Sequence, residues 1–401
     1  MSETILCIGT LDTKGYEVAY IKDLIEKRGH RVIVVDPGIL GKPLLTPDIA
    51  REDVAKAANS SLDNVRKSST AQEARTIMKE GLLKIVKQLY DEGKFSGVIA
   101  IGGSQGSDMG SAVMRELPVG FPTILISSNV AFIGGKSYVG SKDLTLMPSV
   151  VDIAGLNRIT RQVFANAAGA IVGMVELGKV EVSDKPVVVM SMMGPTTSCG
   201  SKVKSELEDR GFEVIVFASI GPGGGALENF VKREDVKGVI ELGVNEVGAA
   251  IYDTFASAGP RRLETAGERG IPRLVTPGCV DVVIFEKEPL PPEFKDHRVY
   301  KHIPEIQVVR QEPNNLKEIA RTMAEKLNRA TEKTKVLLPT RGFSELSREK
   351  KIFYDPEADK VFIDSLKSSL SESIQVKEVE AHINDDSFAN EVLKEFLDML
   401  E

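Results

Sequence analysis

Short apolar runs alternate with helical patterns from the start of the chain, and this alternation restricts the possible fold more than any other feature. Residues 5–9 and 30–36 are continuous runs rich in Ile and Val, whereas residues 17–28 place apolar side chains on one helical face. Continuous apolar strands separated by helices are typical of a parallel sheet covered on both faces. We therefore predict an α/β protein of Rossmann-like domains, each with a mostly parallel sheet.

Several strand-and-turn segments recur in the same order in the second half of the chain. The pairs are residues 24–38 with 207–221, 97–103 with 238–244, and 121–127 with 271–277. They predict two similar domains, residues 1–182 and 183–401, although buried parallel strands also resemble one another without a duplication. The first copy is longer between its second and third strands, which predicts a helical insertion near residues 41–92.

Composition limits the partners and the compartment. The 58 acidic and 51 basic residues leave a net charge of −7, which argues against binding to a nucleic-acid backbone. No run approaches the roughly 20 apolar residues of a membrane helix, and the N-terminus lacks the pattern of a signal peptide. Cys7, Cys199 and Cys279 are too scattered for a disulfide or zinc framework. These features predict a cytoplasmic protein that contacts neither nucleic acid nor membrane.

A glycine-rich segment, residues 101–110, follows a predicted strand and opens a predicted helix. Such a turn exposes backbone N–H groups at the positive end of the helix dipole, which favours an anion such as phosphate. The segment matches neither the dinucleotide fingerprint nor a Walker A loop, and a tight turn without a ligand remains the alternative. The candidate phosphate-binding residues are Gly102, Gly103, Ser104, Gly106 and Ser107.

The first and second predicted strands end in polar residues. Thr10 and Thr13 would donate to phosphate and Lys14 would neutralise it, while Asp12 would hold Mg²⁺. Capping of the following helix by Asp12 or Thr13 is an equal alternative. Asp36 ends the second strand, where a ribose hydroxyl is often bound.

Two further features complete the first-domain candidates. Ser127 closes the strand at residues 123–126 and would line the same crevice if that strand is parallel and adjacent. Asp108, in the helix that opens after the glycine-rich turn, is a second candidate Mg²⁺ ligand.

The second predicted domain offers different chemistry. Its loops supply candidate contacts to a small molecule, namely Thr196, Thr197, Ser198, Gly223, Gly224 and Gly225. The counterpart of the glycine-rich turn, residues 241–246, is acidic and is expected to repel phosphate. We interpret Glu241 and Glu246 as solvated helix charge rather than as an acid/base or metal set. Cys199 is expected to be a buried small residue, since no histidine lies near it in sequence.

These motifs together resemble an uncharacterised protein family whose plant members form the N-terminal, ATP-binding half of a tobamovirus-resistance protein. The resemblance rests on GTLDTKG, GGSQGS, MMGPTTSCG, GGGALE, LLPTRGFSELS, FYDPEAD and HINDDSFA, which are spread in order over nearly the whole chain. It implies two Rossmann-like domains, binding of ATP with Mg²⁺, and a homodimer. The chain departs from the family pattern at Gln105, where a glycine is commoner.

The sequence therefore predicts a nucleotide-binding protein with ATP at the first-domain strand ends, facing a cleft between the domains. ATP-dependent chemistry on a small molecule is one version of this hypothesis. Two alternatives stay open: a non-catalytic nucleotide-sensing or interaction module, and a lyase or isomerase acting on a small acid.

Overall fold

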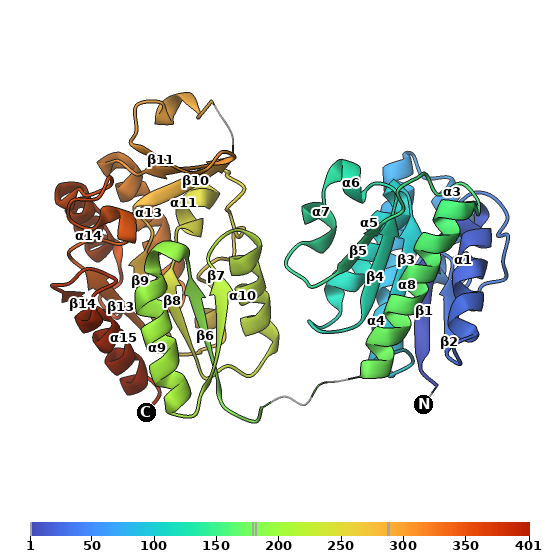
Figure 1. The fold of residues 1–401 in the computed structure, drawn as a ribbon, viewed down its shortest axis with the longest axis horizontal. Coiled ribbons are helices and arrows are strands. Elements are labelled where there is room, and N and C mark those ends of the chain that lie inside the picture. Colours follow the sequence, from blue (N-terminus) through green and yellow to red (C-terminus); the bar gives the residue numbers. More distant parts are fainter. Residues whose placement is uncertain (1, 179, 181–182, 287–288) are drawn as a thin grey trace. The chain divides into compact units, whose positions relative to one another are not determined.

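The computed structural model describes residues 2–178, 180, 183–286 and 289–401, and its contacts divide the chain into two units (Figure 1). Unit 1 comprises residues 1–181 and unit 2 comprises residues 182–401. Each unit is built on its own sheet and is described by itself.

The sheet of unit 1 has five parallel strands in the order β2-β1-β3-β4-β5. The strands are β1 (Thr4–Gly9), β2 (Arg31–Val35), β3 (Gly97–Gly102), β4 (Thr123–Ser127) and β5 (Thr145–Pro148). The chain passes outward from β1 to β2 and then returns to the other side of β1 to form β3. The strand order therefore reverses between β1 and β3.

Helices cover both faces of this sheet. They are α1 (Leu11–Glu26), α2 (Arg51–Ala57), α3 (Leu62–Arg66), α4 (Ala71–Asp91), α5 (Ser104–Glu116), α6 (Val130–Ile133), α7 (Lys136–Val139) and α8 (Arg158–Leu177). One core contains Ile21 of α1 and Phe164 of α8, whereas the core on the opposite face contains Leu82 of α4 and Val113 of α5. The alternation of side chains along each strand explains why a continuous apolar run serves both cores.

Unit 2 repeats this order and adds a strand. Its main sheet runs β14-β13-β9-β8-β6-β7, and all of its paired strands are parallel. The strands are β6 (Val187–Met192), β7 (Glu213–Ala218), β8 (Gly238–Gly243), β9 (Arg273–Gly278), β13 (Thr334–Pro339) and β14 (Gln375–Val379). Thus β6, β7, β8 and β9 correspond to β1, β2, β3 and β4. The predicted pair of Rossmann-like units with mostly parallel sheets is confirmed.

The helices of unit 2 again lie on both faces. They are α9 (Thr197–Asp209), α10 (Pro222–Arg233), α11 (Glu246–Ile251), α12 (Thr265–Glu268), α13 (Pro313–Leu327), α14 (Pro356–Ser369) and α15 (Asp386–Asp398), with short 3₁₀ turns η1 (Gly194–Thr196), η2 (Pro292–Phe294) and η3 (Glu345–Ser347). Val203 of α9 and Phe388 of α15 share one core, and Ile319 of α13 and Phe362 of α14 share another. The C-terminal tail therefore completes unit 2.

Two details differ from the sequence predictions. Unit 2 carries a small antiparallel sheet that the sequence did not indicate, with strands β10 (Val282–Glu286), β12 (Ile306–Arg310) and β11 (Val299–Ile303). In unit 1, α4 connects β2 to β3 as α10 connects β7 to β8, so within the predicted insertion only α2 and α3 are additional helices. Among the helices of the described residues, none has the length and apolar character to cross a membrane.

Candidate functional site

The carboxyl ends of β1 and β3 in unit 1 lie side by side where the strand order reverses. In open α/β sheets, ligands bind outside the strand ends at such a switch point. Thr10 follows β1, and Gly103 joins β3 to α5. The structure therefore brings the two predicted phosphate-binding segments to one edge of the sheet.

The N-terminus of α5 is open. Gly103 is the N-cap residue and provides no side-chain cap, so the first-turn N–H groups of Ser104, Gln105 and Gly106 have no intrahelical acceptor. A Cβ on Gly102 would lie 2.6 Å from Cα of Gly106, which explains glycine at position 102 by close packing. A Cβ on Gly103 would meet nothing nearer than Oγ of Ser128 at 3.7 Å. Packing thus does not require glycine at position 103, and its missing side chain leaves the helix terminus accessible to an anion.

The predicted serines at this turn have different surroundings. Ser107 and Ser127 are buried, and Oγ of Ser107 donates to Oγ of Ser127 at 2.7 Å and to the Gly102 carbonyl at 3.2 Å. The exposed Ser104 accepts a hydrogen bond from Nδ2 of Asn129 at 2.5 Å. The strand that ends at Ser127, β4, thus lies parallel and adjacent to β3, as expected. Ser107 and Ser127 hold the turn together, whereas Ser104 lies on its open side.

A cavity of about 290 Å³ adjoins this helix terminus. Thr10, Asp12 and Thr13 line it from the end of β1, and Gln105 lines it from the first turn of α5. The other side is formed by α3 and α4, including Thr70, Arg66 and Arg75. Neither guanidinium forms an ion pair with a residue in the described part of the chain. The cavity is therefore electropositive on this side.

Asp36, the predicted ribose contact, lies in a buried network. Its Oδ2 accepts hydrogen bonds from Nε and Nη2 of Arg51 at 2.8 and 2.6 Å, and its Oδ1 accepts from the backbone N–H groups of Leu11 and Gly38. Both Asp36 and Arg51 are buried. In this arrangement Asp36 fixes the loop after β2, and a sugar would reach its carboxylate only after the network opened.

The remaining charged candidates are also held by the chain. Oδ2 of Asp12 accepts from the N–H of Gly41 at 3.1 Å, and the ammonium of Lys14 donates to the carbonyl of Ile153. Asp108 forms an ion pair with Lys79 at 3.0 Å. The described residues contain no group of three or more His, Cys, Asp or Glu side chains placed to bind a metal.

In unit 2, the loop after β6 forms the short 3₁₀ turn η1 that leads into α9, and the side chain of the N-cap residue Thr196 does not cap this helix. Oγ1 of the buried Thr196 donates to the Met193 carbonyl at 3.0 Å, whereas Thr197 and Ser198 are exposed at the start of α9. Cys199 is buried, and this burial raises the pKa of its thiol to about 12. It is therefore a packed thiol at neutral pH and not a thiolate nucleophile.

The glycine-rich start of α10 already binds an anion, which belongs to the chain itself. The N–H of Gly224 donates to Oε1 of Glu246 at 3.1 Å, and a Cβ on Gly224 would lie within 2.2 Å of that carboxylate. A Cβ on Gly223 would lie 1.9 Å from the Ala218 carbonyl. Close packing explains both glycines, and the Glu246 carboxyl group lies where contacts to a small molecule were predicted.

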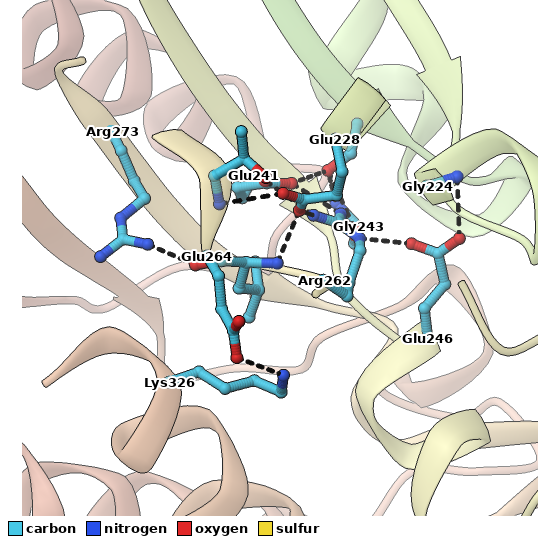
Figure 2. Close-up of polar contacts among 12 residues, drawn as sticks. Gly224, Glu228, Glu241, Gly243, Glu246, Arg262, Glu264, Arg273 and Lys326 are labelled. Atoms are coloured by element: carbon cyan, nitrogen blue, oxygen red, sulfur yellow. Dashed lines mark hydrogen bonds and ion pairs between the residues drawn. The ribbon is translucent and has the colours of Figure 1, made fainter. Parts of the chain in front are cut away.

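Figure 2 shows the network that holds Glu246. Nε of Arg262 donates to Oε2 of Glu246 at 2.5 Å, while its Nη1 and Nη2 donate to the two oxygens of Glu241 at 2.7 and 2.6 Å. Nη1 also lies 3.4 Å from Oε1 of Glu228. All four side chains are buried. The interpretation of Glu241 and Glu246 as solvated helix charge was therefore wrong.

The environment of these carboxylates changes their acidity. Burial raises the pKa of Glu246 to about 7, although the positive charge of Arg262 opposes this shift. Burial also raises the pKa of Glu228, again opposed by Arg262. Three carboxylates around one guanidinium carry an excess of negative charge, so the cluster favours retaining a proton.

Sequence reasoning missed Arg262, Arg51, Arg66 and Arg75. Each lies in a loop or helix without a motif, so its own position gives no signal. The only available signal was Glu241, a carboxylate inside an apolar strand run, since a buried charge requires a partner.

The two units, their switch points and their helix termini define a two-domain α/β protein. Residues 3–179 match the N-terminal domain, and residues 185–400 the C-terminal domain, of the uncharacterised protein family UPF0261. The chain belongs to this family, as the motif resemblance implied.

Similar proteins occur in bacteria and in a plant. A UPF0261 protein of Clostridium tetani is 38% identical over 404 residues, with 100% of both chains covered. The ToMV resistance protein Tm-1(GCR237) of Solanum lycopersicum is 32% identical and covers 99% of this chain, which spans 56% of the tomato protein. Among solved structures, a putative UDP-N-acetylglucosamine 2-epimerase from Listeria monocytogenes aligns with 69% of this chain and 79% of its own, at a TM-score of 0.26 and 10% identity. A similarity at that level carries no argument about the ligand.

Proposed function

We propose that unit 1 binds a nucleotide, ATP, with its phosphates at the N-terminus of α5. The observation that carries the proposal is the open helix terminus at the β1/β3 switch point. Gly103 lies at this terminus, and close packing does not explain why the residue there is a glycine. The N–H groups of Ser104, Gln105 and Gly106 would bind phosphate oxygens, and the hydroxyl of Ser104 would add a donor. Ser107 and Ser127 would act by holding this turn in shape.

Mg²⁺ would be bound mainly through the phosphates, as is usual when few carboxylates are present. Asp12 is the better of the two predicted ligands, because it lines the cavity beside the helix terminus. Asp108 is paired with Lys79 and would not contribute. We do not assign Asp36 or Lys14 to the nucleotide, since both are bound within the chain.

The test is titration calorimetry of the full chain with ATP and ADP, each with and without Mg²⁺, on two matched variants. Gly103→Asp and Gly103→Asn both place a good N-cap residue at an uncrowded position, so both should fold. Only the aspartate brings a negative charge to the phosphate position. We expect Gly103→Asp to weaken ATP binding about tenfold or more, and Gly103→Asn to weaken it clearly less.

Equal affinities of the two variants would contradict phosphate binding at α5. Turnover of ATP in the same samples would separate ATP-dependent chemistry from the nucleotide-sensing alternative. The homodimer implied by the family resemblance stays a prediction, which sedimentation equilibrium tests.

A further inference from the structure

The repeated architecture allows unit 2 to be used as a template for unit 1. Gln105 stands eight residues after Gly97, the first residue of β3, and Glu246 stands eight residues after Gly238, the first residue of β8. The strands β3 and β8 hold the same place in their sheets, each beside the first strand of its unit. Gln105 and Glu246 therefore occupy corresponding positions at the two switch points.

In unit 2 this position supplies a carboxylate to the neighbouring helix. The Glu246 side chain lies against the first turn of α10, where it accepts from the N–H of Gly224 at 3.1 Å and from Nε of Arg262 at 2.5 Å (Figure 2). The carboxylate is fully buried. The space between the switch point and the crossover helix is thus occupied by an anion of the chain itself.

In unit 1 the same position carries a neutral amide and borders an open cavity. Gln105 lines the 290 Å³ cavity, and the crossover helix α4 lines it with Arg75, next to the N-cap residue Thr70. Arg66 donates to the carbonyls of Ile39 and Leu40 at 2.8 and 3.0 Å, so its guanidinium is positioned but not neutralised.

Arg75 has a similar environment. Its Nη2 donates to the amide oxygen of Gln72 at 3.0 Å, which again leaves the positive charge without a carboxylate partner within the described ranges. Among the described residues that line the cavity, Asp12 is the one acidic residue. Its Oδ2 accepts from the N–H of Gly41 and lies 4.0 Å from Nη1 of Arg51, which offsets its charge.

We propose that this cavity is a binding site for a small carboxylic acid, with the ligand's carboxylate taking the place that the Glu246 carboxylate takes in unit 2. Arg66 and Arg75 supply the cationic groups, and the hydroxyls of Thr10 and Thr13 lie at the opposite wall. The cavity volume is at the lower limit for small-molecule sites, which suits a small acid rather than a whole nucleotide.

This site deepens the proposed function and rests on it in one respect: the acid would be the second ligand beside a nucleotide held at Gly103. The two subsites share the first turn of α5, because Ser104 faces the open helix terminus and Gln105 faces the cavity. Nucleotide and acid should therefore bind together and not compete.

The experiment introduces a carboxylate side chain at position 105. Gln105→Glu in unit 1 reproduces the arrangement of unit 2, and Gln105→Met is the matched neutral control. Full-length variants are titrated with malonate, succinate and citrate, and separately with ATP and with inorganic phosphate, at constant ionic strength. We expect the wild-type chain and Gln105→Met to bind at least one acid. Gln105→Glu should lose about tenfold or more of that affinity, the value of a charge-assisted hydrogen bond. Because the N–H of Gln105 lies in the proposed phosphate site, ATP affinity is compared in Arg75→Gln instead, which should keep it within about threefold.

The outcomes separate the two proposals. Loss of both acid and ATP binding in Arg75→Gln, or direct competition between acid and ATP, would show that the cavity belongs to the nucleotide and would overturn the acid site. If inorganic phosphate binds as tightly as succinate, and Gln105→Glu also abolishes this phosphate binding, the proposal that the cavity selects a carboxylic acid would be overturned. ATP binding without any acid binding would refute this inference alone. Arg75→Gln gives an independent check, since it should weaken acid binding without adding a charge to the cavity.

Discussion

Nε of Arg262 lies 2.5 Å from Oε2 of Glu246, and both side chains are buried. Through this contact the loop before α12 is connected to the start of α11 and to the first turn of α10, because Glu246 also accepts from Gly224. The corresponding space in unit 1 is open and lined by Arg66 and Arg75. The two units thus share a strand order but differ in whether the chain fills its own anion position.

Removing the charge of Arg262 should strongly destabilise unit 2. Arg262→Met leaves Glu228, Glu241 and Glu246 buried without their common partner, and breaking a buried ion pair in this way costs about 3–5 kcal/mol. Urea denaturation followed by circular dichroism measures the loss. Arg261→Met is the matched control, because Arg261 pairs with Glu268 at the surface and should cost about 1 kcal/mol or less. Similar losses of unfolding free energy in Arg262→Met and Arg261→Met would contradict the stabilising role of the buried Arg262.

The stability of unit 2 should depend on the proton of Glu246. The pKa of Glu246 is raised in the folded chain from 4.5 to about 7. Its contribution to the free energy of unfolding is therefore fully present below pH 4.5, the pKa in the unfolded chain, and is lost as the pH rises through 7. The unfolding free energy of the wild-type chain relative to Glu246→Gln should therefore fall between about pH 5 and pH 8. Asp359, whose pKa burial also raises to about 7, is present in both proteins and cancels in the comparison. Parallel pH profiles would rule out this role for Glu246.

Gly224→Ala should destabilise unit 2 by displacing Glu246. The added Cβ would lie 2.2 Å from a carboxylate oxygen, and overpacking in a dense region costs about 1–3 kcal/mol. Gly169→Ala is the control, because Gly169 is an exposed residue within α8 and its Cβ would meet nothing within 4 Å. That change should stabilise by about 0.5–1 kcal/mol through helix propensity. Thermal unfolding measures the change in stability of each variant. A change of the same sign in both variants would contradict the packing argument.

The cysteines should be unreactive in the folded chain. Cys7, Cys199 and Cys279 are buried, and burial raises the pKa of each thiol, to about 12 for Cys7 and Cys199. We expect iodoacetamide to modify none of them in native protein near pH 8, about the ordinary range of a free thiol, and all of them after denaturation. Rapid labelling of Cys199 in the native protein, detected by peptide mass spectrometry, would contradict the conclusion that this thiol is buried and unreactive.

The sheets were predictable because their strands are continuous apolar runs whose order is repeated along the chain. The small sheet of β10, β11 and β12 was missed, because its short strands pair antiparallel with one another and lie outside that repeat. The β1 and β3 loops were also placed correctly at one edge, since parallel strands end on the same side.

The polar partners were less predictable. Asp36 was expected to face a ribose, but it binds Arg51, a residue in the additional helix α2. Glu246 was expected in solvent, but it binds Arg262, which belongs to a loop with no periodic pattern. A guanidinium is long, and its partner depends on packing between distant segments. A local motif therefore identifies the helix terminus but not the charges around it.

Hydrogen exchange, measured amide by amide with and without ATP and Mg²⁺, tests the central claim most directly. The N–H groups of Ser104, Gln105 and Gly106 lack intrahelical acceptors, so bound phosphates should slow their exchange markedly. The N–H of Gly224, which already donates to Glu246, should be unaffected. Slower exchange confined to the α5 terminus is the predicted result. Unchanged exchange there at saturating ATP would contradict the proposed nucleotide site.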